Sequence, residues 1–383
     1  MAPGRPLNRT IGRSIALVRL RPLPRLLALL PLWAMAPAPP AHAQQPPTAT
    51  EIDAIFAEWD IPGSPGCVLG VLQDGEWLHR KGYGVRRVRG RGGLNPTTSV
   101  FSLGTASKQF VAVAAALLSA EGRLSLDDDV RVHVPELPSA WPPITPRQLI
   151  HHTAGVPDVA SRLLAGDAPG EMPRSLEEWV TLIALEPTLD FPPGSWYRYS
   201  VAGYHILALA VERVSGESLG SFVGRRVLQP LGMAGTQRQG RVPPVLAFHV
   251  SGHRVSEEGL IVRIPDHRLG WEMRFTLDDL RRWAELTSGD AVGGEALAQI
   301  LASRYTLPHG ETIANTFGVR AHEYRGVPVI HNSARAVGVS HVLIHLPDEG
   351  LSAFCLCNLE TIDAPGLVEE VLDLYGVWRE PRR

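Results

Sequence analysis

The chain is poor in lysine, cysteine and charged residues. It has 383 residues, of which 37 are basic, but only Lys81 and Lys108 are lysines and the other 35 are arginines. Three cysteines are too few for a disulfide-rich scaffold. Charged residues make up 20% of the chain and hydrophobic residues 44%, which excludes a disordered, collagen-like or coiled-coil protein. This balance predicts a globular protein with one large domain or two smaller ones.

The first 43 residues predict a secretory signal peptide. They contain six arginines and no acidic residue, and an apolar run from Leu26 to Ala36 precedes Ala41-His42-Ala43. A positive region, a short apolar region and a small-x-small site are typical of a cleaved signal. The apolar run is shorter than the ~20 residues that a membrane-spanning helix needs. We therefore expect cleavage after Ala43, a periplasmic or secreted bacterial protein, and no membrane span once the signal is removed.

The arginines of that segment conceal an acidic protein. Without those six arginines, 31 basic residues remain against 39 acidic ones. A surface with this excess of negative charge repels a phosphate backbone, and no stripe of basic and aromatic residues opposes it. The sequence therefore predicts a small-molecule or peptide ligand and no nucleic-acid partner. It leaves the oligomeric state open.

The three cysteines leave two alternatives open. Cys67 lies in the first predicted strand, whereas Cys355 and Cys357 point to the same face of a late strand. If those two strands are neighbours, one disulfide and a spare thiol are possible. Three buried apolar thiols are the other interpretation.

Local patterns at the start of the chain predict a helix and a hairpin. Thr48-x-x-Glu51 is a capping box, and apolar residues then recur at helical spacing to about Asp60. Two alternating runs follow, residues 67–73 and 76–83, and Asp74-Gly75 separates them. Asp-Gly between two strands predicts a type I′ turn.

Helices are predicted in the middle of the chain and strands near its end. Helices are expected at 105–121, from 145, and at 175–185, 200–214, 217–228, 276–286, 294–303 and 365–374; strands are expected near 327–331, 339–345 and 352–359. This order implies that both ends of the chain share one sheet. We predict an α+β fold in which terminal helices flank a mainly antiparallel sheet and a helical domain is inserted. The expected boundaries are 44–100, 101–265 and 266–383, with a cleft at the junction.

The start of the long predicted helix carries the residues most suited to catalysis. In Thr105-Ala106-Ser107-Lys108, a hydroxyl and an amine lie three residues apart on one helix face. A hydroxyl at a helix N-terminus beside an amine that can lose its proton is the arrangement of a nucleophile and its base. An arginine cannot serve as this base because its guanidinium keeps its proton. A lysine in so arginine-rich a chain therefore indicates a base at Lys108, while the same chain also keeps a second lysine, Lys81, in a predicted strand.

In these residues and in several other segments, the chain resembles the penicillin-recognising hydrolases, which include class C β-lactamases, D,D-peptidases and related esterases. The resemblance runs from about Pro62 to Tyr375. The matching segments are Phe101 to Phe110, Leu149 to Asp158, Pro193-Gly194, and Tyr199-Ser200 to Gly203-Tyr204, with weaker matches at Thr276, Asp279-Leu280, Phe317-Gly318 and Asn358. The resemblance implies a β-lactamase/transpeptidase-like fold. It also implies acyl-transfer chemistry without a cofactor.

All three active-site motifs of that family are altered in this chain. The Ser-x-x-Lys motif is Thr105-Ala106-Ser107-Lys108, the Tyr-x-Asn motif is Tyr199-Ser200-Val201, and the Lys/His-x-Gly motif is His331-Asn332-Ser333, with Gly338 one residue later than the usual glycine. Threonine keeps an oxygen but its methyl group crowds the approaching carbonyl. Val201 offers no hydrogen bond, and Ser333 replaces a residue that gives the substrate space. The resemblance implies an oxyanion hole formed by the amides of Thr105 and about Ala334.

Two hypotheses of different classes follow. In the first, the protein is an acyl hydrolase of a β-lactam, a D-amino-acid peptide or an ester. Thr105 is its nucleophile, Lys108 and Tyr199 are the base pair, and His331 gives electrostatic support. In the second, the protein is a non-catalytic descendant whose cleft binds a peptide, a cell-wall fragment or a protein partner. The pair His151-His152 also raises a zinc site, but no carboxylate or third histidine accompanies it at metal-binding spacing, so we expect no metal.

Overall fold

The computed structural model describes residues 46–90, 92–165, 172–238, 248–264, 271–284 and 292–380. The chain divides into two units, residues 1–43 and 44–383. The first unit, which contains the predicted signal peptide, lies outside the described residues. Within the described ranges, every helix is too short or too polar to span a lipid bilayer.

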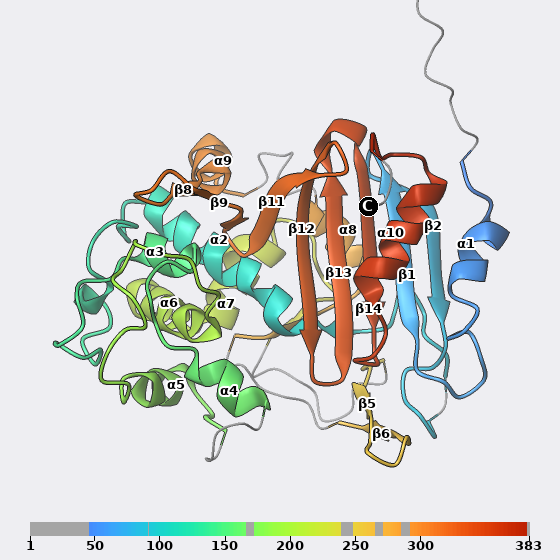
Figure 1. The fold of residues 1–383 in the computed structure, drawn as a ribbon, viewed down its shortest axis with the longest axis horizontal. Coiled ribbons are helices and arrows are strands. Elements are labelled where there is room, and N and C mark those ends of the chain that lie inside the picture. Colours follow the sequence, from blue (N-terminus) through green and yellow to red (C-terminus); the bar gives the residue numbers. More distant parts are fainter. Residues whose placement is uncertain are drawn as a thin grey trace, which may run out of the picture. The chain divides into compact units, whose positions relative to one another are not determined.

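A seven-stranded antiparallel sheet forms the centre of the second unit (Figure 1). In spatial order its strands are β10 (Asn315–Thr316), β11 (Val319–Tyr324), β12 (Val327–Ala336), β13 (Val339–Leu346), β14 (Leu351–Cys357), β1 (Cys67–Gln73) and β2 (Glu76–Tyr83). Because β14 pairs with β1, the two ends of the chain share one sheet. This arrangement confirms the predicted α+β class.

The first hairpin of this sheet has the predicted bounds. β1 and β2 are joined by Asp74 and Gly75, whose φ angles are 50° and 84°. Positive φ at both central residues is what a type I′ turn requires, and Asp-Gly adopts it at little cost. The turn therefore fixes the register of the hairpin locally.

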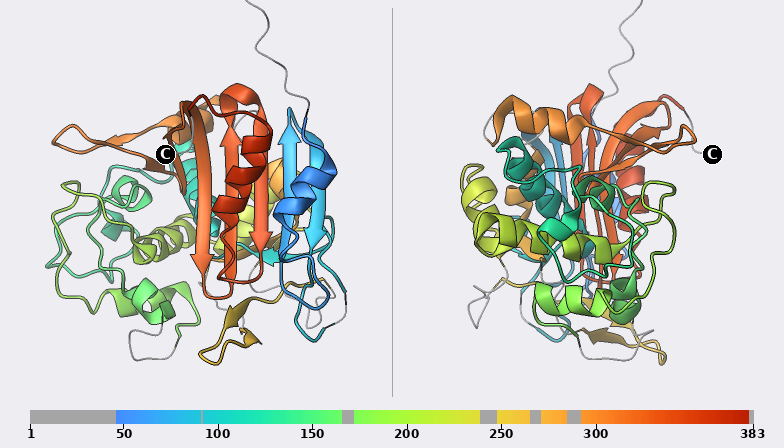
Figure 2. Two further views of the ribbon diagram at one scale, coloured as in Figure 1. Left: turned by 45° about the vertical axis from the view of Figure 1, so that its right-hand side comes forward. Right: turned by 90° about the vertical axis from the view of Figure 1, so that its left-hand side faces the viewer.

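Helices cover both faces of the sheet. α1 (Ala49–Ile55) and α10 (Ala364–Leu374) lie against one face, as Figure 2 shows, and α8 (Leu277–Ala284) packs on the other. The alternation of β1 divides its side chains accordingly: Leu69 and Val71 are buried in the core under α1 and α10, and Val68 in the core on the opposite side. We call these the terminal-helix face and the inner face.

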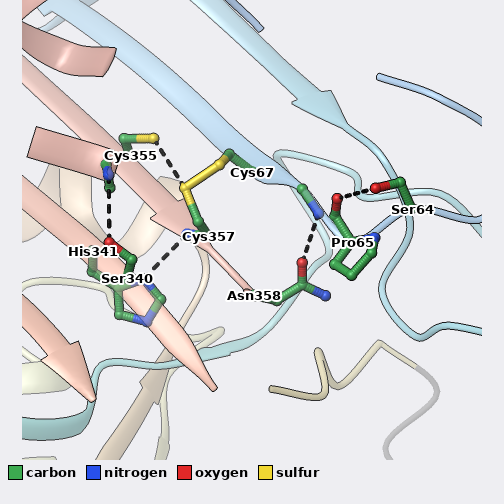
Figure 3. The surroundings of a disulfide bond; sticks show 10 residues. Ser64, Pro65, Cys67, Ser340, His341, Cys355, Cys357 and Asn358 are labelled. Carbon is green, nitrogen blue, oxygen red and sulfur yellow. Dashed lines mark hydrogen bonds between the residues drawn. A yellow bond between two sulfur atoms is a disulfide. The ribbon is translucent and has the colours of Figure 1, made fainter. Parts of the chain in front are cut away.

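A disulfide joins the neighbouring strands β1 and β14, which are the first and the last strands along the chain (Figure 3). Cys67 of β1 and Cys357 of β14 are directly paired in the register and are bonded, with a sequence separation of 290 residues. Cys355 is free and buried, and its Sγ lies 3.5 Å from that of Cys357. Of the two alternatives for the cysteines, the structure has the disulfide with a spare thiol. A link across so long a loop stabilises the fold mainly by restricting the unfolded chain.

Most of the remaining helices lie beside the β10–β11 end of the sheet (Figures 1 and 2). They are α2 (Lys108–Ala120), α3 (Pro146–Ile150), α4 (Val159–Ala165), α5 (Leu176–Ile183), α6 (Val201–Ser215) and α7 (Leu219–Val223), which continues as a π-helical turn to Leu228. The alanine-rich α2 packs against α6 and is buried along nearly its whole length. α9 (Gly294–Ala302) also packs on α2. The expected boundaries 44–100, 101–265 and 266–383 stay a prediction.

Several short strands were not predicted from the sequence. They form three small sheets: β3 (Phe101–Ser102) with β7 (Met273–Phe275) and β4 (Gln237–Arg238); β5 (His253–Val255) with β6 (Ile261–Arg263); and β8 (Tyr305–Thr306) with β9 (Thr312–Ile313). Two or three residues carry too little alternation to be distinguished from a loop. The first of these sheets matters most, because β3 leads directly to Thr105.

Candidate active site

Thr105 lies in a single 3₁₀ turn, Gly104–Ser107, between β3 and α2. Gly104 has a φ of 52°, which turns the chain from the strand into the helix. The turn is tied to β7 by two hydrogen bonds: the Leu103 amide donates to the Met273 carbonyl at 3.3 Å, and the Met273 amide donates to Ser107 Oγ at 3.2 Å. Ser107 is therefore occupied and buried, whereas Thr105 is half-buried.

Lys108 is the first residue of α2 and is almost completely buried. Its side chain is 7% exposed, and its Nζ donates a hydrogen bond to Tyr199 Oη at 2.8 Å. Burial lowers the pKa of Lys108 to about 7, and the negative charge of Asp158 opposes this shift in part. The neutral amine, which is the state that a general base needs, is therefore accessible near neutral pH.

The hydroxyl of Tyr199 lies between Thr105 and Lys108. Burial raises the pKa of this phenol, and its hydrogen bond with the Thr105 side chain lowers it to a smaller extent. The residue as a whole is 37% exposed, but its hydroxyl end contacts both neighbours. Because the phenol keeps its proton at neutral pH, Tyr199 is suited to relay a proton from Thr105 to a neutral Lys108.

Backbone contacts hold Tyr199 in this position. The next residue, Ser200, donates its amide hydrogen to Nδ1 of His152 at 3.2 Å and caps α6 by accepting from the Gly203 amide. The His152 ring packs against the Tyr199 ring with 4.6 Å between centroids. Burial, with the nearby charge of Lys108, holds the pKa of His152 well below its usual value, so it stays neutral and keeps accepting.

Asp158 contributes to the site through the backbone of α6. Its Oδ1 accepts from the amides of Val201 and Ala202 at 3.0 and 3.1 Å. A carboxylate at a helix N-terminus is stabilised by the unpaired amides there. Its negative charge also reaches Lys108, although no hydrogen bond between the two is among those of the described residues. Lys108 is therefore not neutralised by a directly bonded carboxylate.

Val201 is buried and apolar at the position where the family has a polar contact. It is 1% exposed and belongs to the large core of the inner face. Its side chain offers neither Lys108 nor a substrate amide a hydrogen bond. The polar contacts of the Lys108 amine are consequently concentrated on Tyr199.

The alternation of β12 determines which of its side chains face this site. Val327 and Val329 lie in the core of the terminal-helix face, whereas Ala334 lies in the core of the inner face. Side chains of one strand alternate between faces, so His331 and Ser333 belong to the terminal-helix face, and Asn332 and Ala334 to the inner face. The register agrees, because Ile344, opposite His331, packs on the terminal-helix core and Leu343, opposite Asn332, on the inner core.

The structure therefore does not bring His331 to Lys108. The His331 ring lies 5.0 Å from that of His322, and burial, with the charges of His322 and Arg320, lowers its pKa to about 4. Ser333 is exposed on the same face. With the motif at His331-Asn332-Ser333, Gly338 lies one residue further from the motif than the usual glycine does. If the motif is instead Asn332-Ser333-Ala334, Gly338 is at the usual distance, and Ala334 rather than Ser333 faces the site.

Asn332 is the residue of β12 that sequence reasoning missed. It is 7% exposed, and its Nδ2 donates to the carbonyl of Gly318. Gly318 has a φ of 81° and lies directly on the start of α2, since a Cβ there would come within 2.4 Å of the Gln109 backbone. Asn332 thus fixes the turn that covers the backbone of Lys108. The distance of Gly338 from the motif was the available signal for it.

The edge of β12 beside Thr105 is open. β11 pairs with β12 only as far as His331, so residues 332–336 are paired with β13 alone. The 3₁₀ turn of Thr105 packs against β12, and Ala334 is buried. An unpaired strand edge offers backbone amides to an extended or carbonyl-bearing ligand. The predicted oxyanion donors, the amides of Thr105 and Ala334, lie on these two packed segments.

The neighbouring histidines have structural partners. His151 Nδ1 lies 2.9 Å from the Asn315 carbonyl, and His341 Nε2 lies 2.7 Å from the carbonyl of Ser102. Nδ1 of His341 accepts from the Cys357 amide, so Nε2 carries the hydrogen. His341 thereby ties β3, and with it the turn of Thr105, to the disulfide-bonded strand.

Comparisons with known proteins agree with this architecture. The family model described as Beta-lactamase matches residues 52–374. The chain belongs to the beta-lactamase family. The predicted resemblance to the penicillin-recognising hydrolases is thereby confirmed. Protein flp of Staphylococcus aureus (strain N315) is 25% identical over 316 residues, which are 80% of this chain and 62% of that protein. The chain thus spans less than two thirds of the length of this relative.

Two solved structures show the same fold. The octameric penicillin-binding protein homologue from Pyrococcus abyssi superimposes with a TM-score of 0.73 at 22% identity, covering 85% of this chain and 76% of that one. EstCE1, described as a hydrolase with promiscuous acyltransferase activity, superimposes with a TM-score of 0.68 at 21% identity, covering 85% and 98%. At 21–22% identity these two structures show the shared fold.

Proposed function

We propose that this chain is an acyl hydrolase that forms a covalent acyl-enzyme on Thr105. One observation carries the proposal: the Lys108 amine, whose pKa is lowered to about 7, donates to the Tyr199 hydroxyl at 2.8 Å, and this hydroxyl also interacts with the Thr105 side chain. A nucleophile linked to a base that is neutral at working pH is the requirement for acyl transfer. The polar relay and the buried lysine are costly to maintain in a site without chemistry.

In the proposed reaction, a proton moves from Thr105 through Tyr199 to Lys108 and then back through Tyr199 to the leaving group. Thr105 Oγ attacks the substrate carbonyl carbon while its proton passes to the Tyr199 oxygen, and the Tyr199 proton passes to Lys108. The amides of Thr105 and Ala334 stabilise the oxyanion that forms. Lys108 then returns the proton through Tyr199 to the leaving group, so the C–O or C–N bond breaks and acyl-Thr105 remains. Water repeats the sequence to release the acid.

We propose simple esters as the substrates, ahead of β-lactams and D-amino-acid peptides. An amide substrate presents an N–H and a carbonyl beside the scissile bond that need partners, and Val201 supplies neither donor nor acceptor. An ester has no such N–H group to leave unpaired. Ester carbonyls are also more reactive, which matters because the γ-methyl group of Thr105 crowds the attack.

The other candidate is a site that binds a peptide, a cell-wall fragment or a protein without turning it over. The observation that favours it is the apolar, 1% exposed Val201 at the polar position of the family, together with the branched Thr105. Secretion to the periplasm or medium after signal cleavage remains part of the proposal in either case.

Hydrolysis of p-nitrophenyl acetate and of a chromogenic cephalosporin separates the two candidates. For the hydrolase we expect ester turnover by the wild type, background rates for Thr105→Val, and faster turnover for Thr105→Ser because the crowding methyl group is removed. Thr105→Val keeps the shape of threonine and so controls for packing. Background rates in both the wild type and Thr105→Ser, with unchanged circular dichroism spectra, would show a binding site without catalysis.

A further inference from the structure

A pocket lies on the inner face of the sheet, beside α2. Its volume is 480 Å³. It is bounded by β11 to β14 of the sheet and by α2, α8 and α9. This volume falls within the ~300–1,000 Å³ range of small-molecule sites. The pocket is large enough for a ligand and belongs to no step of the proposed acyl transfer.

The lining of this pocket is mainly apolar. Its walls come from the residues Val113, Leu297, Leu301, Ile330, Leu343 and Phe354. Gln109 and Asn332 also line it, but their amides are engaged: Gln109 accepts from Trp283 and donates to Ala106, and Asn332 donates to Gly318. Thr316, His331 and His345 also line it; the Thr316 hydroxyl donates to the Ser303 carbonyl, and His345 Nδ1 lies 3.0 Å from Ser352 Oγ. The interior therefore suits a hydrocarbon chain.

A single arginine provides the charge of the pocket. Arg304, just after α9, is exposed and lines it, and no aspartate or glutamate is among the described lining residues. The guanidinium donates only to the carbonyls of Ala302 and Ser303, and no ion pair joins it to a carboxylate of the described residues. A guanidinium with free N–H groups at the rim of an apolar pocket favours a carboxylate ligand.

The segment Thr316–Gly318 separates the pocket from Lys108. Thr316 and Phe317 line the pocket, and Gly318 lies so close to the start of α2 that a Cβ would come within 2.8 Å of the Lys108 carbonyl carbon. Neither Thr105, Lys108 nor Tyr199 lines the pocket. A ligand there is therefore distinct from the acyl group carried by Thr105.

We propose that this pocket binds a fatty acid, with the alkyl chain between α9 and the sheet and the carboxylate on Arg304. Three observations combine: the volume, the mainly apolar lining and an arginine that is joined to no carboxylate among the described residues. A neutral alcohol of the same chain length fills the same space but gains nothing from Arg304. This difference makes the two parts of the proposal separately measurable.

The test is isothermal titration of the full chain with dodecanoate and with dodecanol below their micelle concentrations. We expect saturable 1:1 binding of dodecanoate by the wild type. Ala298→Trp, which fills the pocket from α9, should weaken it roughly tenfold or more. Ala296→Trp is the matched control, because Ala296 lies on the same helix and outside the lining. Arg304→Gln should weaken dodecanoate about fivefold and leave dodecanol unchanged.

The outcomes are decisive in both directions. No saturable binding by the folded wild type, or equal effects of Ala298→Trp and Ala296→Trp, would overturn the pocket. Equal effects of Arg304→Gln on the acid and the alcohol would overturn the carboxylate assignment. Thr105→Val should bind dodecanoate like the wild type, so a failure of the proposed acyl transfer leaves this measurement intact. Melting curves of each variant show that it is folded.

Discussion

The two lysines of this chain each lie beside a tyrosine, but in opposite electrostatic settings. Lys81 on β2 has a side chain that is 39% exposed, and its Nζ donates to Asp53 at 2.8 Å. Tyr83 donates to the same carboxylate at 2.8 Å. Lys108 is buried and bonded to Tyr199 without a directly bonded carboxylate. A lysine and a tyrosine in contact are thus not in themselves a catalytic pair.

The difference lies in what stabilises the positive charge. Lys81 is partly exposed to solvent and directly bonded to the carboxylate of Asp53. At Lys108, burial disfavours it and lowers its pKa to about 7, while the hydroxyl of Tyr199 is a weak substitute for a carboxylate. Desolvation without neutralisation is what converts a lysine into a base at neutral pH. Substitutions at matched positions of the two pairs test this distinction.

Replacing Lys108 should have the largest effect. In Lys108→Arg the positive charge is retained but the base is lost, because the guanidinium does not deprotonate. We expect p-nitrophenyl acetate turnover to fall about 10²–10⁴-fold. Lys81→Arg, measured in the same assay, should stay close to wild type. Comparable losses in both variants would contradict the distinction between the two lysines.

Removing the tyrosine hydroxyls should separate the pairs next. Tyr199→Phe removes the link between Thr105 and Lys108, and we expect turnover to fall about 100-fold. Tyr83→Phe removes hydrogen bonds to Asp53 and His79 and should cost about 1 kcal/mol of stability with no loss of turnover. Initial rates and urea unfolding of both variants provide the comparison. An active Tyr199→Phe would remove the relay from the mechanism.

The pH dependence of turnover should report Lys108. Its pKa is lowered to about 7, so the neutral base is fully present above pH 8 and is protonated as the pH falls through 7. We expect the ester hydrolysis rate to rise about tenfold per pH unit below 7 and to level off above it. Tyr83→Phe should leave this profile in place. A rate that is flat between pH 5.5 and 8.5 would exclude Lys108 as the base.

We expect the smallest difference between the Lys108 and Lys81 variants in how the free energy of unfolding depends on pH. Because folding lowers the Lys108 pKa from its usual 10.5, the unfolded chain binds more protons between pH 7 and 10.5, and this term raises stability as the pH rises through that window. Lys108→Met should lose that dependence. Lys81→Met, which breaks a partly exposed ion pair, should cost at most about 1 kcal/mol. Thermal melts at pH 7 and pH 9 measure both; the same pH response in Lys108→Met as in wild type would contradict the assignment.

The sequence predicts best where the chemistry is local. Asp74-Gly75 determines a turn by its own φ preferences, and the Thr48 capping box marks the start of α1. Residue type and spacing select Thr105 and Lys108, and the resemblance to the penicillin-recognising hydrolases adds Tyr199; the structure brings the three side chains together.

The β12 strand shows where sequence reasoning fails. Placing the motif one residue too early along β12 exchanges the side chains on the two faces of the strand. For this reason the sequence motif assigns His331 and Ser333 to the site and leaves Asn332 out. Only the pairing of β12 with β13, and the cores on either side, decide this. The Asn332 contact with Gly318 joins β12 to the turn between β10 and β11 and could not be read from a motif.

Intact-mass spectrometry after an activated ester probe, followed by peptide mapping, tests the central claim most directly. We predict a single acyl adduct on Thr105 that accumulates in the wild type, forms faster above pH 7, and is absent in Thr105→Val and strongly reduced in Lys108→Arg. Lys81→Arg should give the same adduct as the wild type. An adduct on another residue, or no adduct on Thr105 in the folded wild type at any pH from 6 to 9, would contradict the assignment of this site.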